Sequence, residues 1–196
     1  MKRILLLGPI LFATVLIVLT IIQYDFMRSL GWHPVNDPTF DWPSGLALGK
    51  YGFVMTTTFI ISGSIMILFA SRLKSDLGPA LTSQTGSTLL ALSGLALAGL
   101  AFTTDPTLRG TPATWHGFLH DLSFVLLGLT LLPGMTILGF AFSQNENWGY
   151  LSRYTWLSVG FAIPTFMLKG AAFYIFIFSI LLWNEVAAIR LYLRQK

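Results

Sequence analysis

Long apolar stretches alternate with short polar segments along the whole chain. The apolar stretches cover residues 4–22, 52–70, 86–102, 112–142, 154–168 and 171–191. Roughly 20 apolar residues in helical conformation cross the hydrocarbon core of a bilayer, so each stretch predicts a membrane-spanning helix. The expected fold is all-α, a polytopic bundle of six transmembrane helices that forms one integral membrane domain over residues 1–196.

The composition supports a membrane protein. The sequence is 54% hydrophobic and only 10% charged, whereas a soluble domain carries roughly a quarter charged residues. The chain has no cysteine, which excludes disulfides, thiolate metal sites, cysteine catalysis and covalent c-type haem attachment. The net charge of +4 is modest and lies mostly at helix ends, so nucleic acid is not an expected partner.

The distribution of basic residues predicts the orientation of the bundle. In a six-helix arrangement the termini and the even loops carry eight of them: Lys2, Arg3, Arg72, Lys74, Arg153, Arg190, Arg194 and Lys196. The odd loops carry four: Arg28, Lys50, Arg109 and Lys169. Cytoplasmic loops are enriched in basic residues, so we expect a multi-pass protein of the cell membrane with both termini in the cytoplasm. All three histidines then lie on the outer side.

The fourth apolar stretch has a polar entrance that contains two histidines. Thr111 is suited to cap this helix, and Pro112 is suited to its first turn. His116 and His120 are one helical turn apart on the same face, with Asp121 beside them. Ionisable side chains are unusual at the mouth of a membrane helix and are often functional, so this segment is the main candidate for a site.

Other polar residues are expected on the same outer face. The predicted binding cluster consists of His33, Asp37, Asp41, Asp105, Arg109, His116, His120 and Asp121. Asp105 and Arg109 suit an ion pair that shapes the turn before the fourth helix, or a pair that orients a lipid headgroup. Glu185, in the last helix, suits an interhelical acid near the cytoplasmic boundary or a proton relay.

A metal site is one interpretation of the histidines. His116 and His120 can reach one ion, and a third ligand from His33 or an aspartate would suit zinc. With an open coordination position, such a zinc ion could activate water for hydrolysis of a lipid at the outer leaflet. The alternative is that both helical histidines hydrogen-bond to the loops and bind no cofactor.

Short motifs along nearly the whole chain resemble one known family. They are Ser44–Gly52 (SGLALGKYG), Asp105 and Arg109 before His116, His120-Asp121-Leu122, and Ile180-Leu181-Leu182-Trp183 followed by Arg190-Leu191. The chain is similar to the bacterial and archaeal six-helix membrane proteins grouped as domain of unknown function 998. This resemblance implies the six-helix fold and no particular activity.

Two functional hypotheses follow from the sequence. The first is a polar outer-face site that binds a membrane lipid or a partner protein, with the chain acting as a small accessory subunit of a larger membrane complex. The alternative is an outer-face metal-dependent lipid hydrolase that uses the histidine and aspartate cluster.

Overall fold

The structure is a computed structural model that describes residues 3–32, 43–105, 114–167 and 171–194. All regular secondary structure in these ranges is helical, which confirms the all-α prediction. The elements are α1 (Ile4–Ile22), α2 (Tyr24–Ser29), the 3-10 helix η1 (Pro43–Leu48), α3 (Gly52–Leu77), α4 (Leu81–Gly99), α5 (Trp115–Ser143), α6 (Gly149–Met167) and α7 (Ala171–Arg194).

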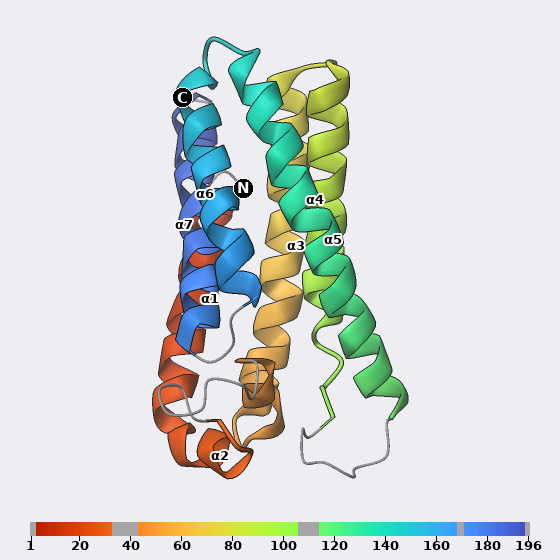
Figure 1. The fold of residues 1–196 in the computed structure, drawn as a ribbon, viewed down its shortest axis with the longest axis vertical. Coiled ribbons are helices and arrows are strands. Elements are labelled where there is room, and N and C mark those ends of the chain that lie inside the picture. The colour runs from red at the N-terminus through yellow and green to blue at the C-terminus, as the bar shows by residue number, and fades with distance from the viewer. Residues whose placement is uncertain (1–2, 33–42, 106–113, 168–170, 195–196) are drawn as a thin grey trace.

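The long helices form a closed ring. Each packs against the next long helix along the chain, and α7 returns to pack against α1. Figure 1 shows these helices side by side along the long axis of the molecule, with α2 and η1 at one end. The connections α3–α4 and α5–α6 lie at the opposite end, where α7 also ends. Short connections of this kind make sequence neighbours antiparallel neighbours in space.

Several helices extend beyond their predicted bounds. Helix α3 continues to Leu77, α4 begins at Leu81, α6 begins at Gly149 and α7 continues to Arg194. Hydropathy marks only the lipid-compatible part of a helix, whereas backbone hydrogen bonds continue into polar residues at its ends. The predicted start of the fourth apolar helix is also wrong, because α5 begins at Trp115.

Four of the described helices are long and apolar enough to cross a membrane. These candidate spans are Ile4–Ile22, Gly52–Leu77, Trp115–Ser143 and Phe173–Arg194. Helices α4 and α6 lie alongside them in the same bundle (Figure 1). Many exposed side chains are large and apolar, including Ile21, Phe53 and Leu129, which are between 64% and 70% exposed. The molecule is therefore a membrane-like helical bundle.

The polar segment between the first two apolar stretches contains α2 and η1. Gln23 ties these elements together. Its side-chain Nε2 donates to the Leu46 carbonyl at 3.0 Å, and its Oε1 accepts from the Tyr51 backbone N–H at 3.0 Å. Because Gln23 is buried, these bonds satisfy polar groups that would otherwise lack water. They hold η1 against the junction of α1 and α2.

Candidate binding cavity

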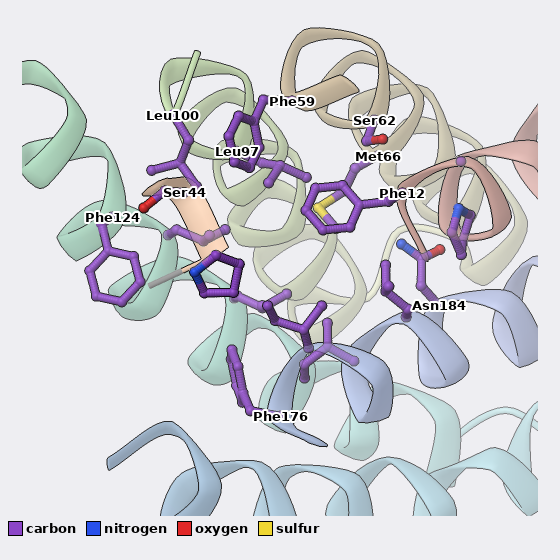
Figure 2. A pocket seen from close by; sticks show the side chains of 18 of the residues that line it. Phe12, Ser44, Phe59, Ser62, Met66, Leu97, Leu100, Phe124, Phe176 and Asn184 are labelled. Carbon is purple, nitrogen blue, oxygen red and sulfur yellow. The ribbon is translucent and has the colours of Figure 1, made fainter. Parts of the chain in front are cut away.

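A cavity of about 110 Å³ lies inside the ring of long helices. Its walls come from α1, η1, α3, α4, α5 and α7, and its lining includes members of both large groups of buried apolar side chains. Figure 2 shows the aromatic rings of Phe12, Phe59, Phe124 and Phe176 around it. Aliphatic side chains complete most of the wall. The cavity therefore offers an apolar environment of the kind that hydrocarbon prefers.

Three deeply buried polar side chains interrupt this apolar wall. Ser62 of α3, His120 of α5 and Asn184 of α7 are 6%, 4% and 5% exposed, and all three line the cavity. None of the described residues that line it is an aspartate, glutamate, lysine or arginine. Small numbers of placed polar groups in an apolar pocket are typical of ligand sites.

Two of these side chains carry atoms whose hydrogen-bonding capacity is unused. Within the described ranges, Ser62 Oγ and Asn184 Oδ1 are buried and have no hydrogen-bond partner. Ser64, two residues further along α3, instead donates to the Ile60 carbonyl at 2.8 Å. A buried polar group without a partner costs about 1–3 kcal/mol. A ligand that bonded to these atoms would remove that cost.

The ring of His120 is held by backbone carbonyls at the C-cap of α4 and just beyond it. Its Nδ1 lies 2.7 Å from the Phe102 carbonyl oxygen and 3.2 Å from the Leu100 carbonyl oxygen. A carbonyl oxygen can only accept, so we assign the Nδ1 proton to this side of the ring. In the neutral imidazole the lone pair is then on Nε2. His120 thus stabilises the end of α4 and keeps one acceptor atom.

His116 is anchored in the same way one turn earlier on α5. Its Nδ1 is 2.9 Å from the Thr103 carbonyl oxygen and 3.0 Å from Thr114 Oγ1. The ring also meets Trp115 edge-to-face at 5.7 Å. Both histidines therefore face the segment that follows α4, which agrees with the prediction that they share one helix face. Their bonds also match the alternative in which they hydrogen-bond to a loop.

Thr114 caps α5 and connects the helix to Asp105. Its hydroxyl oxygen accepts the Gly117 backbone N–H at 3.1 Å, and Asp105 accepts the Thr114 hydroxyl and its backbone N–H. A Cβ at residue 117 would lie only 2.0 Å from Asp105 Oδ2, so glycine allows this approach. Thr114 therefore replaces Thr111 as the cap of this helix, because it is the residue that reaches the open N–H groups.

The hydrogen bonds from Thr114 hold the pKa of the Asp105 carboxyl below its ordinary value, and the charge of a protonated His116 would lower it further. A depressed folded-state pKa adds stability above the unfolded pKa of about 4, and that stability is lost as the pH falls through the folded value. We therefore expect Asp105→Asn to lower the melting temperature of the detergent-solubilised protein at pH 7. The difference from wild type should shrink below about pH 4.

The control for this experiment is Asp121→Asn, which removes the same charge from an exposed side chain near the start of α5. Melting curves of the three proteins should be recorded from pH 3 to pH 8. A difference between wild type and Asp105→Asn that stayed constant over this range would contradict the assignment.

The structure places only part of the predicted outer-face cluster. Asp105, His116 and His120 lie together between α4 and α5, joined through Thr114 and the carbonyls of Phe102 and Thr103 that follow α4. Asp121 is exposed on α5. The remaining members lie outside the described residues: His33, Asp37, Asp41 and Arg109. The Asp105–Arg109 ion pair therefore stays a prediction.

The zinc interpretation also stays a prediction. Within the described ranges no group of three or more histidine, cysteine, aspartate or glutamate side chains could hold a metal ion. The predicted third ligand, His33, lies outside those ranges. The Nδ1 atoms of His116 and His120 face carbonyl oxygens, so each ring would offer a metal its Nε2.

Sequence reasoning did not single out Ser62 and Asn184. Ser62 is a small residue of a kind common at contacts between membrane helices, and in the last helix the charged Glu185 is a more conspicuous candidate than its neighbour Asn184. The available signal was an amide in an apolar helix, because polar residues at membrane depth need partners. Sequence could not show that Asn184 faces a cavity, since this depends on the rotation of α7 against its neighbours.

Comparison with known proteins adds one finding. The sequence model of the family described as "Protein of unknown function (DUF998)" matches residues 6–190. No curated protein and no solved structure matches the chain. The match covers nearly the whole sequence and includes all the described residues that line the cavity. The protein therefore belongs to the DUF998 family of proteins of unknown function.

Proposed function

We propose that this protein is a six-span membrane protein whose central cavity binds one apolar chain of a membrane lipid. The observation that carries the proposal is the buried apolar cavity with unused polar atoms on Ser62 and Asn184. Binding of a lipid is favoured over docking of a partner protein, because a narrow chain can enter a space between helices. The role of an accessory subunit would need a docking surface of its own.

The burial pattern of α4 and α6 supports six spans. Their polar side chains include Ser87, Ser93 and Thr155, which are at most 1% exposed and so are shielded from the surroundings. Most of their outward positions are apolar, with Leu95 61% and Leu157 73% exposed, and the exposed polar residues include Thr85, Thr88 and Arg153. Mean hydropathy counts inward and outward residues alike, so it understates how well these helices suit lipid. We propose that both cross the bilayer and that the termini are cytoplasmic.

Single-cysteine labelling tests this topology cleanly, because the wild-type chain has no cysteine. We expect a membrane-impermeant maleimide to label Ser29→Cys in intact cells and Ser143→Cys only after permeabilisation. The two serines are both exposed and are separated by α3, α4 and α5. Labelling of both from the same side would mean that α4 does not span. A reversed pattern would overturn the proposed orientation.

Photolabelling tests whether a chain enters the cavity. We expect an alkyl diazirine lipid probe in membranes to label inward residues such as Phe176 and Leu181 saturably. Labelling of the outward Leu182, which is 58% exposed, should rise with probe concentration without saturating. Mass spectrometry of the labelled peptides separates these positions.

The matched variants are Ser62→Leu, which places a larger side chain at the cavity wall, and Ser64→Leu, which places it on the exposed side of α3. The first should reduce the saturable labelling at least about threefold, and the second should leave it unchanged. Probe that labels only outward residues in the wild type would refute lipid binding in the cavity.

A further inference from the structure

We infer that the ligand of the cavity is neutral and carries a hydroxyl group, which makes a single-chain aliphatic alcohol the chemical class that fits. This inference rests on the proposed function and deepens it, because it specifies the polar end of the bound molecule. The argument uses the charge of the lining, the donors and acceptors that it presents, and its size.

The lining excludes an anionic ligand. No lysine or arginine is among the described residues that line the cavity. A carboxylate or a phosphate at this depth would lose its hydration without gaining an opposite charge, which is strongly unfavourable. A free fatty acid in its ionised form and the headgroup of a phospholipid are therefore poor ligands for the buried part of the cavity.

The polar atoms of the lining fit a ligand that donates a hydrogen bond. Asn184 Oδ1 is an acceptor, Ser62 Oγ can accept or donate, and His120 Nε2 is an acceptor in the tautomer assigned above. An alkane, an ether or an ester offers no donor. A hydroxyl group offers one donor and accepts as well, so it also fits if the Asn184 amide is rotated by 180°.

Size and placement favour a single chain. The volume of about 110 Å³ is below that of an engineered cavity of about 150 Å³ that binds benzene, so the cavity takes the polar end and first carbons of one chain, and two acyl chains would not fit. In the view of Figure 2, Ser62, Asn184, Phe12 and Met66 are on one side of the cavity, and Phe124 and Ser44 are on the other. The two side chains with unpartnered atoms, Ser62 and Asn184, therefore share a side in this view, and we place the hydroxyl end of the ligand there.

The test is a competition experiment on the full-length protein in detergent. A photoreactive dodecyl alcohol labels the cavity peptide, and 1-dodecanol, 1-methoxydodecane and dodecanoate at pH 8 compete for labelling. We expect the alcohol to compete at a concentration about fivefold to tenfold lower than the ether, as one added hydrogen bond implies. Dodecanoate should be the weakest competitor.

Asn184→Leu removes the acceptor at similar volume, and we expect it to reduce the alcohol-to-ether preference to less than about twofold while chain binding persists. Ser62→Ala, which is the milder change, should reduce the preference in part, and Ser64→Ala on the exposed side of α3 should keep it. Comparing the ratio between variants cancels the different partition of the competitors into detergent micelles.

The outcomes distinguish a failure of the hydroxyl assignment from a failure of chain binding in the cavity. Saturable labelling with equal competition by alcohol and ether in the wild type would overturn the hydroxyl assignment and leave chain binding in place. An alcohol preference that survives in both Asn184→Leu and Ser62→Ala would also overturn it. Absence of saturable labelling with any probe would overturn the proposed function itself.

Discussion

Replacing Gly63 with alanine is expected to destabilise the bundle by about 3 kcal/mol. A Cβ at Gly63 would lie 2.4 Å from the Gly94 carbonyl oxygen and 2.6 Å from the Ala98 backbone nitrogen. Both are backbone atoms of α4, so no side-chain rotation relieves the overlap. The helices would have to move apart, which forfeits the close contacts that hold membrane helices together.

The measurement is the thermal unfolding of the purified protein in one detergent, followed by circular dichroism or by loss of the monodisperse peak. Gly160→Ala is the matched control, because no atom lies within 4 Å of the Cβ that it adds to α6. If Gly63→Ala and Gly160→Ala melted at the same temperature, the close approach of α3 and α4 would be refuted.

Replacing Trp148 with alanine is expected to cost about 3–5 kcal/mol. Trp148 is fully buried and stacks on Phe142 with ring centroids 5.0 Å apart at 11°. Its Nε1 also donates to Asp76 Oδ2 at 2.8 Å, and the same oxygen lies 3.4 Å from Arg194 Nε. One side chain therefore joins the α5–α6 connection to the ends of α3 and α7.

Two further variants separate the contribution of the Trp148 hydrogen bond from that of the buried ring. Trp148→Phe keeps most of the ring and removes the bond to a charged acceptor, so we expect a loss of about 2 kcal/mol. Trp115→Ala makes the same truncation at a side chain that is 70% exposed, and it should cost about 1 kcal/mol or less. Equal melting temperatures for Trp148→Ala and Trp115→Ala would contradict the structural role of Trp148.

Much of the packing between α3 and α4 could be predicted from small residues. Membrane helices pack closely wherever glycine, alanine and serine recur on one face. The structure confirms this at Gly63 and Gly94, where the two backbones meet. In contrast, the sequence did not predict α2 and η1, because prolines and charged residues between α1 and α3 obscure any helical period.

The candidate site was predicted less completely than the fold. The shared face of His116 and His120 followed from their spacing, since residues four apart lie one above the other. Their partners could not be predicted, because the Thr103 and Phe102 carbonyls that hold them come from the non-helical segment that follows α4. The cavity was missed for a similar reason, since its polar atoms belong to three helices.

Local sequence is sufficient for the helical class, the apolar segments and the membrane-like character of this protein, because each depends on the composition of a single continuous stretch. The ring closure between α1 and α7 and the cavity shared by Ser62, His120 and Asn184 depend on the tertiary structure. Each of these arises where residues distant in sequence meet. The rotation and spacing of packed helices, which a hydropathy pattern does not encode, decide which side chains share that space.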